Sequence, residues 1–225
     1  MTHELRIRVG ERTGDVSALL DRPARAFALY VFGHGAGAGM RHAFMQDVAA
    51  RLAERDIATL RYQFPYLEHA SRRPDPQPVL FATVRAAVGA ARDAAPGLPL
   101  FAGGKSMGGR MSSLAAAAEA LPGVLGLTFF GFPLHPPRRP GTERADHLQR
   151  VSLPMLFLQG TRDELAHLDL LRPVLENIGT RARLHIVDGA DHGFHVLKRS
   201  GRSDADVLDD ICNAAVDWMR AVARA

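Results

Sequence analysis

The residues best suited to covalent chemistry lie in a glycine-rich segment near the middle of the chain, Gly104-Lys105-Ser106-Met107-Gly108. A short apolar run precedes the segment, and an alanine-rich run over residues 111–121 follows it. Strand, tight turn and helix in this order is the context in which a Gly-x-Ser-x-Gly turn exposes a serine hydroxyl. A Cβ at either outer glycine would push the helix away from the strand. We therefore expect Ser106 to be a nucleophile.

A serine hydroxyl needs a neighbouring base, and the base needs a carboxylate that orients it. Candidates follow Ser106 in the order aspartate, then histidine, which is the order expected after such a turn. Asp163 comes just after the apolar run 154–159, and His192 comes just after the run 182–187. Because each residue follows a predicted strand, we expect the three side chains to meet as a catalytic triad.

Other residues could fill two of these roles. Asp188 or Asp191 could be the acid instead of Asp163, although Asp191 is adjacent to His192 and is poorly placed to bond its ring. His195 competes with His192 for the role of base. We predict His192 because it lies nearer the end of the preceding strand.

Acyl transfer also requires donors for the negative charge that develops on the carbonyl oxygen. One donor is expected from the backbone amide of Met107, the residue after the nucleophile. The second is expected from the glycine-rich turn of residues 33–39, from Ala36 first and Gly37 next. These three amides form the predicted oxyanion hole.

Two nucleotide-binding patterns overlap the same glycines. Gly104-Lys105-Ser106 ends like a phosphate-binding loop, but Pro99 occupies the position of its first glycine and fixes the backbone there. Gly33-x-Gly35-x-x-Ala38 is a weak dinucleotide fingerprint, and Arg61 would suit a 2′-phosphate. Neither pattern explains the serine, aspartate and histidine described above. We therefore expect no cofactor.

Length and composition bound the fold and the partners. The chain has 225 residues, 47% of them hydrophobic, and we expect a single domain over residues 1–225. Its one cysteine, Cys212, excludes an internal disulfide and is expected to be a core residue, and no Cys/His spacing suggests a metal site. The net charge is +4, but the arginines are scattered without interleaved aromatic residues, so we expect no nucleic-acid partner.

No apolar run reaches the roughly 18 residues of a membrane span, so no membrane association is expected. Residues 1–10 alternate charged and apolar side chains and lack the apolar core of a signal peptide. We expect a cytoplasmic protein that is a monomer or a homodimer.

Hydrophobic periodicity predicts an α/β fold with a mostly parallel central sheet and helices on both faces. The expected strands are residues 3–9, 15–20, 26–32, 57–62, 98–102, 124–130, 154–159 and 182–187, the first two antiparallel. The expected helices are a segment carrying Met45, Val48, Ala49 and Leu52, then residues 79–91, 111–121, 165–178 and 203–223.

The predicted connections determine how open the site is. Residues 63–78 are expected to be a proline-bearing loop, and residues 132–154 are expected to be mostly irregular. The second segment is too short to hold a helical lid domain. We therefore expect an open, shallow site.

Six blocks of the sequence resemble a small family of α/β-hydrolases related to dienelactone hydrolases. The blocks lie between about Phe27 and Trp218 and read HGAGAG, RYQFPY, GGKSMGGR, GFPLHPP, LQGTRD and ADHGFHVLKRSGR. The resemblance implies the compact hydrolase fold with Ser106, Asp163 and His192 as the triad. Dienelactone hydrolases use a cysteine nucleophile, so the serine argues against that particular substrate.

The same blocks draw attention to loops that we expect around the mouth of the site, at residues 64–66 and 135–137 and at His147. We predict His34, Tyr66 and His135 as substrate-binding residues. Capping of a proline turn is the alternative role for His135.

Taken together, these features predict a serine hydrolase that cleaves a small carboxylic ester or thioester through an acyl-enzyme, without a metal or an organic cofactor. The expected partner is a small acyl substrate. The alternative is a hydrolase fold used mainly to bind a protein partner, because eukaryotic relatives include a subunit of a chromatin-associated complex. An intact triad favours the enzyme.

Overall fold

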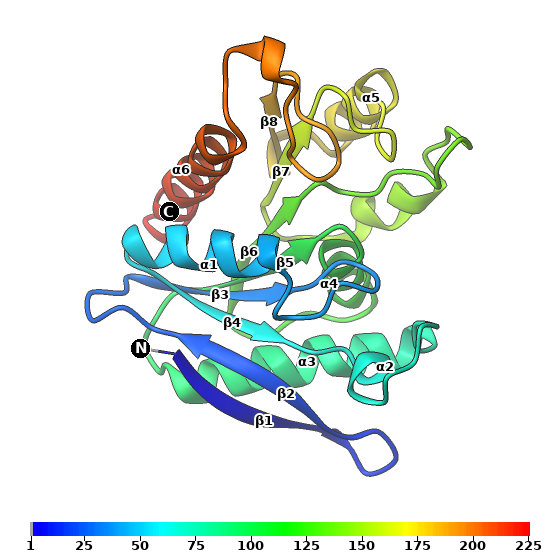
Figure 1. Cartoon of the computed structure of the whole chain (residues 1–225). Helices are drawn as coiled ribbons and strands as arrows, with labels where there is room; N and C mark the ends of the chain where they lie inside the picture. Colours follow the sequence, from blue (N-terminus) through cyan, green and yellow to red (C-terminus); the bar gives the residue numbers. More distant parts are fainter. Residues whose placement is uncertain (1) are drawn as a thin grey trace.

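A single eight-stranded sheet runs through the computed structural model, which describes residues 2–225 (Figure 1). In sequence order the strands are β1 (Thr2–Gly10), β2 (Gly14–Asp21), β3 (Ala28–Gly33), β4 (Ile57–Tyr62), β5 (Leu100–Lys105), β6 (Val124–Phe130), β7 (Met155–Gly160) and β8 (Ala182–Val187). Their spatial order is β1-β2-β4-β3-β5-β6-β7-β8, with antiparallel pairing up to β4 and parallel pairing from there on. The predicted mostly parallel sheet is confirmed.

Helices cover both faces of the sheet, as predicted. They are α1 (Ala43–Glu54), α2 (Pro65–Glu68), α3 (Gln77–Ala94), α4 (Met107–Ala118), α5 (Leu168–Ile178) and α6 (Asp204–Ala223), with 3₁₀ turns η1 (Glu143–Arg150), η2 (Gly179–Arg181) and η3 (Lys198–Ser200). Helices α1 and α6 pack on one face, and α3, α4 and α5 pack on the other. No helix within residues 2–225 is long and apolar enough to cross a membrane.

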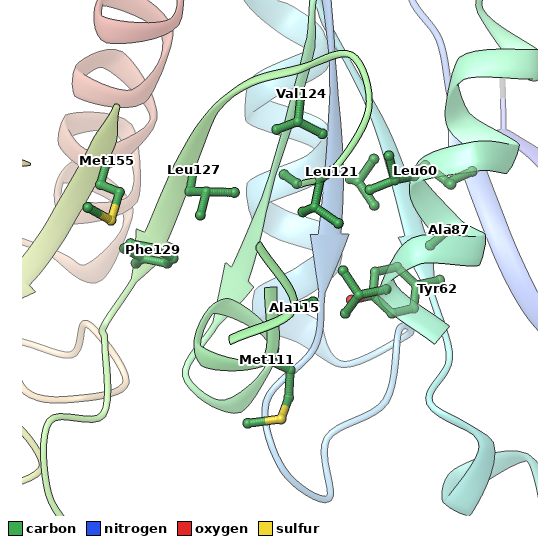
Figure 2. Close-up of a cluster of buried hydrophobic side chains, with 14 of the residues drawn as sticks. Leu60, Tyr62, Ala87, Met111, Ala115, Leu121, Val124, Leu127, Phe129 and Met155 are labelled. Carbon is green, nitrogen blue, oxygen red and sulfur yellow. The ribbon is translucent and has the colours of Figure 1, made fainter. Parts of the chain in front are cut away.

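The central strands are apolar throughout because both of their faces are covered. In β5, Phe101 points toward the layer under α1 and α6, whereas Leu100 and Ala102 point toward α3 and α4. Figure 2 shows the second layer, where side chains from β4, α3, α4, β6 and β7 come together. Its labelled members are Leu60, Tyr62, Ala87, Met111, Ala115, Leu121, Val124, Leu127, Phe129 and Met155.

Parallel pairing brings the carboxyl ends of six strands to one edge of the sheet. Strands β3, β4, β5, β6, β7 and β8 all end there. Ligand sites of open α/β sheets lie at this edge. The predicted triad residues, which follow β5, β7 and β8, therefore start from the same edge of the sheet.

The structure differs from the prediction in two places and agrees with it in a third, the segment between β6 and β7. The loop at 63–78 contains the short helix α2, where Pro65 occupies the first helical position and suits it because its fixed φ is already helical. Helix α4 begins at Met107, directly after the serine, because the glycines at 108 and 109 belong to its first turn. The segment after β6 forms the 3₁₀ turns of η1 and contains no α-helix, so no helical lid is present between β6 and β7.

Candidate active site

The turn at Ser106 joins β5 to α4 with a strained backbone. Ser106 has φ +49° and ψ −114°, a conformation that costs energy for a residue with a side chain. A Cβ on Gly104 or Gly108 would overlap the carbonyl oxygen of Gly33 on the neighbouring strand. The two glycines therefore let α4 start directly against β3 and leave the serine at the tip of the turn.

The structure brings the three predicted triad residues into a hydrogen-bonded chain. The Ser106 hydroxyl is 2.9 Å from Nε2 of His192, and Nδ1 of His192 is 2.7 Å from Oδ2 of Asp163. The Asp163 side chain is 1% exposed and the His192 side chain 25% exposed. A buried carboxylate that accepts from Nδ1 leaves Nε2 free to accept the serine proton.

The alternative acids and the alternative base have other partners. The Asp191 side chain accepts hydrogen bonds from amides of its own turn, including that of His195 at 2.9 Å. The His195 ring pairs with Asp204 at 2.8 Å, away from the serine. Asp188 accepts from the Thr161 hydroxyl at 3.2 Å. Each of these residues is bonded within its own loop or to a neighbouring segment, and none is hydrogen-bonded to Ser106.

Gln159, at the end of β7, supports the triad and escaped the sequence analysis. Its side-chain amide donates to Oδ2 of Asp163 and accepts from the backbone N–H of Phe132 at 3.0 Å. The amide of Leu165 donates to the other oxygen of the same carboxylate at 2.8 Å. A lone amide side chain in an otherwise apolar strand is a signal that could have identified this residue.

Two of the three predicted oxyanion donors, the amides of Met107 and Ala36, remain candidates, and the third does not. Met107 is the first residue of α4, so its amide has no acceptor within the helix. Ala36 lines the same cavity as Ser106. The prediction for Gly37 is corrected, because its amide donates to the Tyr66 hydroxyl at 2.8 Å and is not free to hold an oxyanion.

His34 and Tyr66 shape the glycine-rich turn and do not line the cavity, which corrects their predicted role. The buried His34 ring is bonded to the Gly35 carbonyl at 2.8 Å through Nδ1 and accepts the Phe64 amide at 3.1 Å. Burial lowers the pKa of His34 to about 4, so the ring is neutral near pH 7. Tyr66 is likewise committed to the backbone of the turn, through the amide of Gly37.

The histidines beyond β6 are structural, and the predicted contact of His135 with substrate is corrected as well. His135 is buried, with Nδ1 bonded to the Pro136 carbonyl at 3.0 Å and Nε2 bonded to the His167 amide at 3.3 Å. The alternative role of capping a proline turn is the one observed. His147 bonds the Ser113 hydroxyl at 2.7 Å, and burial is the main cause that lowers its pKa to about 4.

A cavity of about 690 Å³ opens onto Ser106 between α1, α6 and the turn that carries His192. This volume lies in the usual range for small-molecule sites and exceeds the shallow site that we expected. Helix α1 and the turn at 192–195 form the walls of this cavity. The prediction of a shallow site considered only the absence of a lid. The apolar lining of the cavity comprises Ala36, Ala38, Ala43, Phe44, Met45, Leu165, Phe194 and Leu208.

Arg61, which could have bound a 2′-phosphate, and the cysteine Cys212 are both buried in the fold. Arg61 is buried and pairs with Asp21 at 2.7 Å, so it is not available to a 2′-phosphate. Cys212 is buried in α6, and burial raises its pKa to about 12. Within residues 2–225, no group of three or more His, Cys, Asp or Glu side chains could hold a metal ion.

Comparison with known proteins gives the family of the chain and several structures with a similar fold. A family model described as an alpha/beta hydrolase domain matches residues 26–220. Dienelactone hydrolase from Anabaena variabilis has a similar structure at 21% identity, with a TM-score of 0.78 and coverage of 98% of this chain and 97% of that one. An alpha-beta serine hydrolase homologue from Coxiella burnetii gives 18% identity, a TM-score of 0.74 and 96% coverage of both chains. A lidless a/b serine hydrolase from Xanthomonas campestris gives 21% identity, a TM-score of 0.73 and coverage of 96% and 94%.

Proposed function

Because the chain belongs to the alpha/beta hydrolase domain family, we propose that it is a serine hydrolase that cleaves a small carboxylic ester or thioester through an acyl-enzyme. The observation that carries the proposal is the continuous chain of hydrogen bonds from Ser106 through His192 to Asp163. A serine at a strained strand-to-helix turn, bonded to a histidine that a buried carboxylate orients, is the arrangement that activates a hydroxyl.

In the first half of the reaction, the Ser106 oxygen attacks the carbonyl carbon while its proton passes to Nε2 of His192. Asp163 stabilises the imidazolium that forms. His192 then gives the proton to the leaving alcohol or thiol, and the acyl group stays on the serine as an ester. In the second half, water takes the place of the leaving group, loses its proton to His192 and releases the acid. His192 finally returns the proton to the serine.

The oxyanion is held, in this proposal, by the amides of Met107 and Ala36. The Met107 amide heads α4, where the helix dipole also favours negative charge. The Tyr66–Gly37 hydrogen bond and the His34 ring fix the turn that presents Ala36. Removal of one such donor from a hydrolase typically costs about 10²–10³-fold in rate.

The cavity supports a substrate with a compact apolar part. Most of its lining is apolar, and the rings of Phe44 and Phe194 stack with centroids 5.8 Å apart close to the nucleophile. Proteins of similar structure include one described as a serine hydrolase homologue and one described as an esterase domain, which is consistent with ester cleavage. The volume of about 690 Å³ accommodates both the acyl and the leaving group of a small ester.

The proposal is tested by intact-mass spectrometry after exposure to a small fluorophosphonate. Wild-type protein should gain one adduct, Ser106→Ala should gain none, and His192→Ala should react much more slowly. Ser152→Ala is the matched control because Ser152 is exposed and is not among the residues that line the cavity, and it should label like the wild type. Ester and thioester panels then identify the leaving group. Folded wild-type protein that forms no adduct would contradict the proposal and favour a partner-binding role.

A further inference from the structure

Lys105 is next to the proposed nucleophile in the chain, and its side chain is hydrogen-bonded to the main chain of the proposed base. It is the last residue of β5 and immediately precedes Ser106. Its side chain lines the cavity, and its ammonium donates a hydrogen bond to the backbone carbonyl of His192. The two residues that exchange the proton are therefore joined a second time, through Lys105 and the main chain.

The surroundings of this ammonium leave it little freedom. Nζ lies 5.5 Å from the ring centroid of Phe44 and 5.4 Å from that of Phe194, both within the range of cation–π attraction. Gly131, after β6, has φ +70°, and a Cβ there would lie 3.0 Å from Nζ and 3.4 Å from the ring of His192. Two aromatic rings and a glycine thus leave a space that the lysine fills.

A charge in this position is unfavourable for the fold alone. Burial lowers the pKa of Lys105 to about 8, although the carboxylates of Asp163 and Asp191 oppose the shift. A methionine would fill the same space without removing a charge from water. A desolvated charge beside the proposed nucleophile therefore serves the reaction and not the stability of the fold.

We propose that Lys105 is a positioning residue, whose hydrogen bond to the carbonyl of His192 keeps the imidazole within bonding distance of the serine. The inference rests on the proposed hydrolase function. Asp163 fixes the ring of His192 from one side through Nδ1. Lys105 fixes the main chain that carries the ring, so that rotation and translation of the base are both restrained. Displacement of a catalytic group by about 1 Å can cost about 10²-fold in rate.

The test compares Lys105→Met with Lys198→Met. Lys198 is the only other lysine of the chain, and it is exposed on η3 outside the cavity lining. For the best ester of the panel, kcat of Lys105→Met should fall at least tenfold while KM changes less than twofold. Its rate of fluorophosphonate labelling should fall in parallel. Lys198→Met should keep both rates.

Thermal unfolding separates positioning from a general loss of structure. Lys105→Met should unfold at or above the wild-type temperature, because the substitution removes a desolvated charge. If kcat stays within twofold of wild type, or if only KM changes, the positioning role is overturned. A change in KM alone would mean that the ammonium binds substrate. Wild-type protein that is neither labelled nor active would instead overturn the proposed function, so the two failures are distinct.

Restoration of the ammonium provides a second test. Lys105→Cys should have low kcat, and alkylation of the new thiol with bromoethylamine should place an ammonium at nearly the original distance. The native Cys212 should stay unmodified, because it is buried and its pKa is raised to about 12. Intact mass confirms a single adduct. Recovery of kcat by fivefold or more supports positioning by the ammonium, and a complete adduct without recovery overturns it.

Discussion

Histidines lie on both sides of the Ser106 turn, but their surroundings differ. On the side of α1 and α6, the His192 ring is partly exposed and one of its nitrogens faces the serine in an open cavity. On the side of η1, His135 and His147 are buried and bonded to the protein itself. A histidine whose ring nitrogens are both engaged by the backbone, as in His135, has no capacity left for a substrate. The bonding partners separate these histidines: both ring nitrogens of His135 are bonded to the backbone, whereas those of His192 are bonded to the side chains of Ser106 and Asp163.

The sharpest contrast between the two sides should come from a pair of serine substitutions. Ser106→Ala should lower kcat/KM for an ester by about 10⁴-fold or more, because the nucleophile is lost. Ser113→Ala removes the hydroxyl that His147 bonds and should leave kcat/KM within threefold of wild type. Initial rates on one chromogenic ester measure both. Comparable losses for the two variants would abolish the distinction between the sides.

The buried carboxylate should give the next largest effect. Asp163→Asn keeps the shape of the side chain but favours the wrong tautomer of His192, and equivalent changes in other triads cost about 10⁴-fold. Asp191→Asn is the matched control in the neighbouring loop, since its amide oxygen still accepts from the turn. We expect kcat of the control to fall less than tenfold. Equal losses would show that the effect is not specific to Asp163, and a larger loss in Asp191→Asn would point to Asp191 as the acid.

Substitution of Gln159 tests whether the Asp163 carboxylate needs the hydrogen bond that Gln159 donates to it. Gln159→Leu should lower kcat by about 10–100-fold, because Asp163 loses one donor and the Phe132 amide loses its acceptor. The change also buries an unpaired amide, so we expect a fall of about 1–3 kcal/mol in the free energy of unfolding. Steady-state kinetics and urea unfolding measure the two effects. An unchanged kcat in a destabilised protein would limit Gln159 to a structural role.

A smaller effect is expected at the glycine-rich turn. Tyr66→Phe removes the acceptor of the Gly37 amide and should loosen the turn that presents Ala36. We expect kcat to fall about three- to tenfold with little change in KM, since the oxyanion exists only in the transition state. A rise in KM without a fall in kcat would return Tyr66 to the substrate-binding role first predicted for it.

The η1 side should respond to pH through stability and not through catalysis. The pKa of His147 is about 4 in the folded protein and 6.5 without burial, so the unfolded chain takes up the proton first as pH falls. This histidine therefore removes stability progressively between about pH 6.5 and 4. His147→Gln should make the thermal midpoint less dependent on pH in that window, while kcat at pH 7 stays within twofold. An unchanged slope would show that His147 does not titrate there.

Periodicity and chain order were sufficient to predict the sheet, the helices on both faces and the residues that meet at Ser106. The strands at 57–62, 124–130 and 182–187 have the predicted bounds because apolar runs between loops define them. The lone amide in an apolar strand could have marked Gln159, but neither its hydrogen-bond partners nor those of Tyr66 were predictable in this way. Each role depends on a hydrogen bond to a residue that is distant in sequence or in another loop, such as Gly37 or Phe132, and hydropathy carries no information about such bonds.

In the proposed hydrolase, the separation of Ser106, Asp163 and His192 along the chain makes activity a measure of completed folding. Ser106 and His192 are 86 positions apart, and their contact requires β6, β7 and β8 to have joined β5. Contacts of such sequence separation form late, because the intervening chain loses entropy before the contact stabilises it. A chain emerging from the ribosome would therefore gain a reactive serine only after β8 and the turn beyond it have paired. The fraction of molecules that react with a fluorophosphonate would then count native molecules directly, without a spectroscopic probe.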